Sequence, residues 1–170
     1  MKRILFSLYL SLIAILTFAT DGFTVADVFT DHMVLQRNAI IKIWGEAQNG
    51  SLVEVRFAGQ LQKVKAIQGK WQVTLKTGEA GGPYKLEVIN GNNKVSFQDV
   101  LIGDVWLAGG QSNMEFALRR VKDAQTEISL ADYPQIRYYK VPRKFYPEQE
   151  VSKASWRVCS PQTAPEFSAI

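Results

Sequence analysis

The stretch of sequence that decides the fold covers residues 51–76 and reads SLVEVRFAGQLQKVKAIQGKWQVTLK. Apolar side chains occupy alternate positions in it, at Val53, Val55, Phe57, Val64, Ala66, Trp71, Val73 and Leu75. Because successive side chains of a strand point to opposite faces, this period of two indicates strands with one buried face. Ala58-Gly59 and Gly69-Lys70 separate the apolar runs at the spacing of β-hairpins.

The same alternation extends beyond this stretch. It returns at Tyr84, Leu86 and Val88. Further turn signals lie at Asn49-Gly50, Gly81-Gly82-Pro83 and Asn90-Gly91-Asn92-Asn93. Short strands separated by regular turns are typical of an antiparallel β-sandwich. We therefore predict a β-sandwich domain over residues 21–101.

The pattern changes after Gly103. Val105-Trp106-Leu107-Ala108 is apolar without alternation, as in a strand that is covered on both faces. A helix-like spacing follows at Met114, Leu118, Val121 and Ile128, and Tyr133-Pro134 ends that pattern before a second apolar segment, Ile136–Val141. Residues 102–141 are therefore predicted to form one β-α-β unit with a right-handed crossover.

The remainder of the chain is loop-like. Prolines stand at positions 142, 147, 161 and 165, and little periodicity is left between them. About 70 residues are too few to cover both faces of a parallel sheet. We therefore expect residues 102–170 to be the first part of an incomplete α/β domain, and the chain to be the front part of a longer protein.

Ser112 lies at the predicted turn from strand to helix, directly after Gly109-Gly110-Gln111. Glycines allow a sharp turn that leaves a serine exposed at the edge of a sheet. The free N–H groups and the dipole of the following helix would stabilise an oxyanion there. Ser112 is therefore a candidate nucleophile.

Two patterns weigh against that reading of Ser112. Ser112 and Glu115 have the Ser-x-x-Glu spacing of a capping box, and helix caps greatly outnumber catalytic serines. The nucleophile elbow of α/β-hydrolases requires glycine two residues after the serine, where this chain has Met114. The local pattern therefore leaves a helix cap and a nucleophile both open.

A serine nucleophile also needs a base, and the chain contains 1 histidine, His32. His32 lies far upstream in the strand-rich region. Asp104 stands at the start of the predicted strand, about 13 Å from its end at Ala108 at the usual rise per residue. We predict that neither side chain activates Ser112, and that Asp104 anchors the end of a strand or loop.

Composition argues against several other kinds of site. With 1 histidine, 1 cysteine and no spaced carboxylate cluster, the chain has almost no zinc ligands. The Walker and dinucleotide-binding spacings are both unmet, so no cofactor is expected. Cys159 is predicted to be a small buried apolar group. The sequence has no clustered basic face, so we do not expect it to bind nucleic acid.

Residues 1–20 are predicted to be a signal peptide. Lys2 and Arg3 precede an apolar run that ends in Thr17-Phe18-Ala19, and the run is shorter than the roughly 20 residues of a membrane-spanning helix. Its removal leaves 18 basic against 16 acidic residues, a net charge of about +2. We expect an exported protein, periplasmic or extracellular, with no stable membrane insertion after cleavage.

Three separated segments resemble one known family in family order. Gly109–Glu115, after Gly103-Asp104-Val105-Trp106, resembles the first catalytic block of the sialate O-acetylesterases, within the SGNH-type hydrolases. Asp31-His32-Met33-Val34-Leu35-Gln36-Arg37, followed by Ile43-Trp44-Gly45, resembles the start of their N-terminal β-domain. Trp156, Ser160-Pro161 and Phe167-Ser168-Ala169 also match that family.

This resemblance implies a serine esterase that removes O-acetyl groups from sialic acids. Ser112 matches the nucleophile of the family, and its backbone N–H would be one oxyanion donor. The family's further glycine, asparagine and Asp-x-x-His block have no counterpart in this chain. Without that base Ser112 keeps the pKa of an ordinary alcohol, so we expect this chain alone to have little or no activity.

Two rival functions remain open. The first catalytic block also resembles that of acetylxylan and related carbohydrate acetylesterases, so the substrate is either O-acetylated sialic acid or another acetylated sugar. Alternatively, the chain is a non-catalytic carbohydrate-binding β-domain in which Trp44, Trp71 and Tyr84 stack on sugars. Aromatic residues on strands more often fill a core. The sequence does not indicate an oligomeric state.

Overall fold

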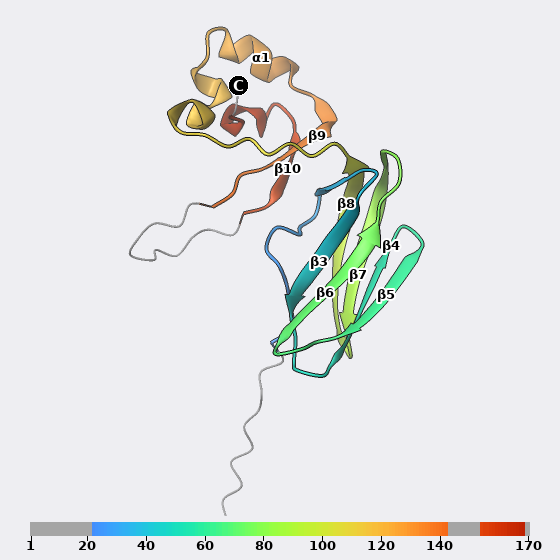
Figure 1. The fold of residues 1–170 in the computed structure, drawn as a ribbon. Helices are drawn as coiled ribbons and strands as arrows, with labels where there is room; N and C mark the ends of the chain where they lie inside the picture. Colours follow the sequence, from blue (N-terminus) through green and yellow to red (C-terminus); the bar gives the residue numbers. More distant parts are fainter. Residues whose placement is uncertain (1–21, 143–153, 169–170) are drawn as a thin grey trace, which may run out of the picture.

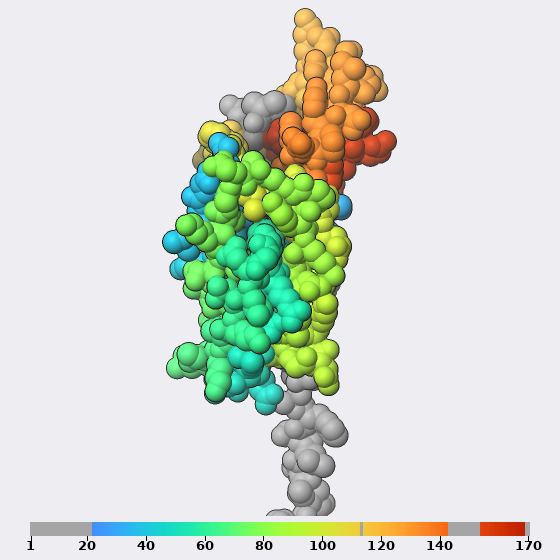
Figure 2. Space-filling model, turned by 90° about the vertical axis from the view of Figure 1, so that its right-hand side faces the viewer, coloured from blue at the N-terminus to red at the C-terminus, as the bar shows by residue number. Residues whose placement is uncertain are grey.

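The computed structural model describes residues 22–142 and 154–168. A strand-rich part reaches to Gly103, and a part with short helices and two strands follows it (Figure 1). In the space-filling view, the orange and red C-terminal segments gather at one end of the strand-rich body (Figure 2). The predicted signal peptide, residues 1–20, lies outside the described residues.

The strand-rich part contains two sheets. The smaller sheet has the order β1-β3-β6, with β1 at Thr24–Val25, β3 at Ile40–Glu46 and β6 at Lys70–Lys76. The larger sheet has the order β2-β8-β7-β4-β5. Its strands are β2 at Val34–Gln36, β4 at Leu52–Phe57, β5 at Gln60–Lys65, β7 at Gly81–Asn90 and β8 at Asn93–Gly103.

Both sheets contribute side chains to one hydrophobic core. The smaller sheet supplies Ile43, Trp71, Val73 and Leu75, and the larger one supplies Leu35, Val53, Val55, Phe57, Leu86, Val88, Val100 and Ile102. Burial alternates along β6 from one residue to the next, as the sequence predicted. The alternating pattern therefore identified the buried faces of the central strands correctly.

The prediction of purely antiparallel sheets is wrong at one edge. β2 pairs in parallel with β8, with Val34 opposite Leu101 and Gln36 opposite Gly103. Turn residues at hairpin spacing predict pairing only between strands that follow one another in the chain. This pairing joins segments far apart in sequence, so no turn signal marks it.

The predicted turns hold with one exception. Ala58 and Gly59 join β4 to β5 with φ of 45° and 78°, the positive values that tight hairpins require. Gly81-Gly82-Pro83, expected to form a turn, instead opens β7. At Gly82 the φ is 127°, and a Cβ would lie 2.9 Å from the Val100 carbonyl oxygen, so glycine permits the close approach of β8.

The predicted β-α-β unit over residues 102–141 is wrong. Val105-Trp106-Leu107-Ala108 forms no strand, and the Trp106 and Leu107 side chains are 88% and 94% exposed. The elements that follow are η1 at Ser112–Glu115, η2 at Leu118–Arg120, α1 at Ala124–Leu130, β9 at Tyr133–Tyr139, β10 at Trp156–Cys159 and η3 at Ala164–Glu166. β9 pairs antiparallel with β10.

Two physical causes explain these differences. A strand needs a neighbour to pair its backbone groups, and no described residue pairs with Val105–Ala108 as a strand. The predicted helix breaks at Asp123, whose φ of 60° lies in the left-handed region and cannot continue a right-handed helix. Single turns of 3₁₀ helix therefore replace the first part of it.

Within residues 22–142 and 154–168, no helix has the length and apolar character that crossing a membrane requires. Cys159 is a free thiol and half-buried, so it is less enclosed than the sequence predicted.

Candidate functional site

Ser112 is the exposed first residue of η1. The turn closes with a hydrogen bond from the Met114 N–H to the Gln111 carbonyl (2.9 Å). A Cβ on Gly110 would lie 2.5 Å from Met114 Cγ, whereas a Cβ on Gly109 would meet nothing within 4 Å. A Cβ at position 110 would therefore displace the Met114 side chain, and Ser112 is the first residue of a short 3₁₀ turn.

The extended arm that leads to Ser112, residues 104–111, is anchored at its start. Arg37 Nε donates to Asp104 Oδ1 (2.9 Å), and the Val105 N–H donates to Gln36 Oε1 (2.8 Å). The Arg37 N–H also donates to the Gly103 carbonyl (2.8 Å). The prediction that Asp104 anchors a strand end is confirmed, because the carboxylate follows the last residue of β8.

The short elements that follow the serine turn along the chain are bonded to one another. The Leu118 N–H donates to the Phe167 carbonyl (2.8 Å), and Arg119 forms an ion pair with Glu166. The Tyr138 hydroxyl donates to the Thr163 carbonyl (2.8 Å), and its ring stands edge-on to Phe167 at 5.5 Å. Backbone and side-chain bonds thus connect η2, β9 and η3.

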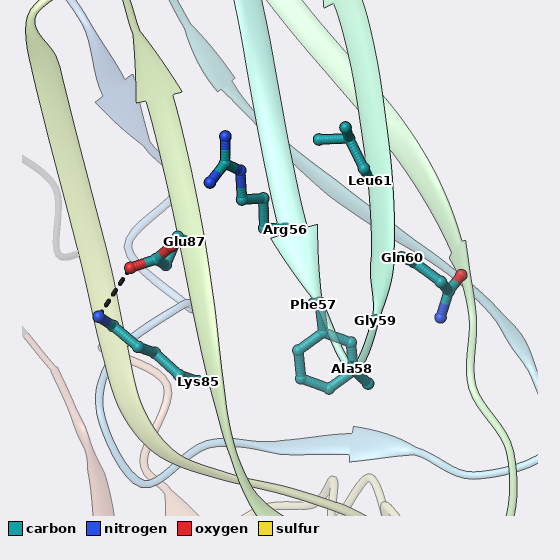
Figure 3. A pocket seen from close by; sticks show the side chains of 8 residues that line it. All are labelled: Arg56, Phe57, Ala58, Gly59, Gln60, Leu61, Lys85 and Glu87. Atoms are coloured by element: carbon teal, nitrogen blue, oxygen red, sulfur yellow. Dashed lines mark ion pairs between the residues drawn. The ribbon is translucent and has the colours of Figure 1, made fainter.

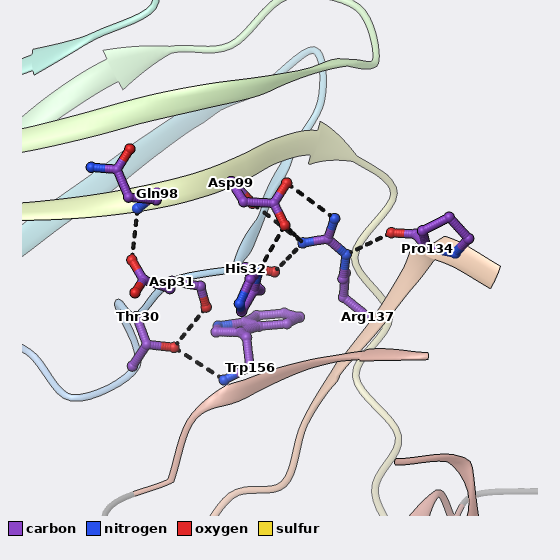
Figure 4. Close-up of polar contacts among 8 residues, drawn as sticks. All are labelled: Thr30, Asp31, His32, Gln98, Asp99, Pro134, Arg137 and Trp156. Atoms are coloured by element: carbon purple, nitrogen blue, oxygen red, sulfur yellow. Dashed lines mark hydrogen bonds and ion pairs between the residues drawn. The ribbon is translucent and has the colours of Figure 1, made fainter. Parts of the chain in front are cut away.

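Among the described contacts, His32 bonds Asp99 and not Ser112. Its Nδ1 lies 2.7 Å from Asp99 Oδ2, and the imidazole is 46% exposed (Figure 4). The backbone of both residues is in the left-handed region, with φ of 66° at His32 and 52° at Asp99. His32 is the only histidine of the sequence, so no imidazole is hydrogen-bonded to Ser112 among the described residues.

Arg137 of β9 completes the cluster around Asp99. Its side chain is 5% exposed, and Nη1 lies 2.9 Å from Asp99 Oδ2. The same guanidinium donates to the carbonyls of His32 (3.1 Å), Asp99 (3.2 Å) and Pro134 (2.8 Å). Burial raises the pKa of the Asp99 carboxyl, but the hydrogen bonds from His32 and Arg137 outweigh it and hold that pKa below its ordinary value.

Trp156 adds a second connection between the two parts of the molecule. Its indole N–H donates to the Val28 carbonyl (2.9 Å), and its backbone N–H donates to Thr30 Oγ1 (3.0 Å).

The sequence analysis did not identify Asp99 or Arg137 as site residues. Each is an isolated charge in the sequence, and no local pattern indicates a contact between residues 38 positions apart.

A shallow hollow lies at the end of the β4–β5 hairpin (Figure 3). Its lining comes from β4, β5, β7 and the turn between β4 and β5, and it includes Arg56, Leu61, Lys85 and Glu87. No residue of the Ser112 arm contributes to it. Hydrogen bonds from Lys85 and Lys94 lower the pKa of Glu87 to about 2.

The aromatic residues proposed for sugar stacking face mainly inward. Trp71 is 2% exposed, and its indole N–H donates to the carbonyls of Thr24 and Glu46, both at 3.2 Å. Tyr84 packs edge-on against Phe57. Trp44 alone of the three is substantially exposed, at 44%. These positions do not form the exposed platform that a carbohydrate-binding module needs.

Among the described residues, no group of three or more histidine, cysteine, aspartate or glutamate side chains could hold a metal ion.

Comparisons with known proteins identify relatives of the chain. The sialate O-acetylesterase of Homo sapiens is 35% identical over 133 residues, and that of Rattus norvegicus is 36% identical over 135 residues. Each match covers 71% of this chain, and 25% and 24% of the respective relative. No protein-family model matches the chain.

A solved structure agrees with these relatives. A carbohydrate acetylesterase from Xanthomonas citri aligns with a TM-score of 0.80 and 36% identity, over 86% of this chain and 34% of that one. The resemblance to sialate O-acetylesterases is therefore confirmed at the level of homology. The chain spans about a quarter of the length of the curated relatives it matches.

Proposed function

We propose that this chain carries the nucleophile of an esterase that removes acetyl groups from sugars, and that Ser112 is that nucleophile. Homology to sialate O-acetylesterases and to a carbohydrate acetylesterase supports the activity. The observation that carries the role of Ser112 is its exposed position on a turn closed around Gly110, at the end of an anchored arm. A reacting carbonyl has open access to a hydroxyl placed there.

The proposed reaction is acyl transfer. A base takes the proton from Ser112 Oγ as the oxygen attacks the acetyl carbonyl, and the backbone N–H of Ser112 donates to the oxyanion. Collapse of the tetrahedral intermediate breaks the bond to the sugar oxygen, which receives the proton. Water then hydrolyses the acetyl-enzyme to acetate and free serine.

We place the base outside this chain. No hydrogen bond of the described residues joins the only histidine, His32, to Ser112, and the curated relatives are about four times as long as the part that matches. In this proposal, residues 21–101 form a β-sandwich domain, and residues 102–170 begin an α/β domain of the SGNH type. Residues 1–20 direct export, which N-terminal sequencing of the secreted protein would test.

Turnover of a chromogenic acetyl ester tests the role of Ser112. We expect the 170-residue chain to be no more active than its Ser112→Ala variant. In a protein of the relatives' length, Ser112→Ala should lower kcat by roughly 10⁴-fold or more. Activity of the short chain that disappears in Ser112→Ala would show that it holds its own base. Full activity of the long variant would refute the nucleophile.

Within acetylated sugars, O-acetylated sialic acid is the proposed substrate, because the curated relatives are named for sialate. The carbohydrate acetylesterase from Xanthomonas citri keeps other acetylated carbohydrates, such as xylan, as the second candidate. Acetate release from 9-O-acetylated sialic acid and from acetylated xylan by the longer protein separates the two.

A further inference from the structure

We infer that the segment Asp31–Arg37 is a positioning element that holds both ends of the region bearing Ser112. The sequence singles out this segment by resemblance alone, without a role for it. Its relevance to catalysis rests on the proposed function of Ser112. The structural part of the inference stands independently of it, because it concerns which contacts fix the arm.

The C-terminal end of the element holds the departure point of the arm. Gln36 Oε1 accepts the Val105 N–H (2.8 Å), and Arg37 bonds the Asp104 carboxylate through Nε (2.9 Å). Gln36 is also the last residue of β2, directly opposite Gly103 of β8. The arm therefore leaves the sheet in a direction that two side chains of the element determine.

The N-terminal end of the element, Asp31 and His32, contacts β9, where the chain comes back to the element. His32 bonds the Asp99 carboxylate, and the His32 carbonyl accepts from Arg137 of β9 (3.1 Å). Asp31 Oδ1 accepts the Gln98 N–H (2.7 Å), which ties the same turn to β8 (Figure 4). β9 follows α1, so the chain that departs at Asp104 returns to the element about 30 residues later.

The element can serve as a fixed reference because its middle is buried. Met33 is 1% exposed and Leu35 is 7% exposed, both within the core. The Leu101 N–H donates to the Met33 carbonyl (3.0 Å), which fixes the element to β8 between its two ends. Displacement of the start of the arm, at Asp104 and Val105, thus requires loss of bonds to a segment that is fixed in the core. None of these residues is proposed to touch the substrate.

Hydrogen exchange in the 170-residue chain tests the inference directly. Gln36→Leu removes the acceptor of the Val105 N–H, and within residues 104–112 we expect exchange at Val105 to become about five- to tenfold faster. Gln36→Glu keeps an acceptor oxygen and should restore most of the protection. Unchanged exchange at residues 104–112 in Gln36→Leu would overturn the inference.

A matched pair of arginines supplies the control. Arg37 and Arg56 are both ion-paired and 41% and 55% exposed, but Arg56 pairs with Glu54 within β4, which β8 and β7 separate from β2 in the sheet. Arg37→Met should accelerate exchange at residues 104–112, and Arg56→Met should not. Equal acceleration in both variants would mean a general loss of stability, and would count against a positioning role.

Kinetics of the longer protein provide the second readout. Gln36→Leu and Arg37→Met should lower kcat about tenfold with KM little changed, and Gln36→Glu should recover kcat. If Ser112→Ala leaves activity intact, the proposed function fails while the exchange result still decides the structural inference. If exchange responds and kcat does not, the element holds the arm without positioning a nucleophile, and the inference is overturned in its catalytic part.

Discussion

The strand-rich part and the part after Gly103 differ in which apolar side chains they bury. Before Gly103, large apolar side chains such as Phe57, Ile43 and Leu86 are at most 2% exposed. After it, the buried hydrophobic residues among those described are alanines, Ala117, Ala131 and Ala164. Trp106 and Leu107 remain outside any core. Similar apolar sequence therefore gives a core in one part and an exposed surface in the other, according to whether a neighbouring strand is present.

The sharpest test of this difference compares two leucines. Leu86→Ala in β7 should lower the free energy of unfolding by 2–5 kcal/mol, because it empties a fully packed site. Leu107→Ala in the arm should change it by about 0.5 kcal/mol or less. Urea denaturation of both variants measures this. Equal losses would show that Leu107 is buried in solution.

A second test concerns the connection between the two parts. Arg137→Met removes a buried guanidinium and leaves Asp99 with His32 alone, which should cost about 2 kcal/mol. Arg157→Met, on the neighbouring strand β10 and exposed, should cost about 0.5 kcal/mol or less. Thermal unfolding with fluorescence detection compares them. Identical melting curves for the two variants would show that Arg137 does not stabilise the connection between the two parts.

A third test addresses the serine turn. Gly110→Ala places a Cβ against Met114, and we expect a loss of about 1 kcal/mol together with shifted amide resonances over residues 110–118. Gly109→Ala meets open space and should leave those resonances in place. NMR spectra of the two variants distinguish them, and matching perturbations would contradict the close packing at Gly110.

The smallest expected effect is on the outer face of the larger sheet. Glu87 bonds Lys85 and Lys94, both at 2.7 Å, and its pKa is lowered to about 2. A lowered pKa in the folded state means that the contribution to stability is present above about pH 4.5 and lost as the pH falls toward 2.

The variant Glu87→Gln checks this sign. Its deficit relative to the natural chain should be measurable by urea denaturation at pH 6 and should shrink at pH 2.5. A deficit that grows on acidification would contradict the ion pairs at Glu87. Added salt should reduce the deficit at pH 6, because the group lies at the surface.

Sequence patterns predicted the strands whose partners are adjacent in the chain. The β4–β5 hairpin follows from alternation in both strands and from Ala58-Gly59 between them. The parallel pairing of β2 with β8 carries no such signal, since it depends on the folded core. Val105–Ala108 was expected to form a strand, yet a strand requires a partner, and hydrophobicity alone does not supply one.

Some residues of the candidate site were predicted from the sequence and others were not, depending on whether a local pattern marks them. Ser112 follows from a local pattern of glycines and from resemblance, and its role as nucleophile stays a prediction. Asp104 was correctly expected to be an anchor. Arg137 was missed because its acceptors, the carbonyls of His32 and Pro134 among them, are set by backbone geometry that a sequence does not display.

The exposure of Trp106 gives the protein its own optical probe. Of 4 tryptophans, Trp106 is 88% exposed and Trp71 is 2% exposed. Iodide in solution should quench the emission of Trp106 most, that of Trp44, which is 44% exposed, less, and that of Trp71 least, so a Trp44→Phe variant isolates the Trp106 signal. Any molecule that covers the arm would shift the Trp106 emission to shorter wavelength and protect it from iodide, so contact with residues 104–111 can be followed by fluorescence without a label.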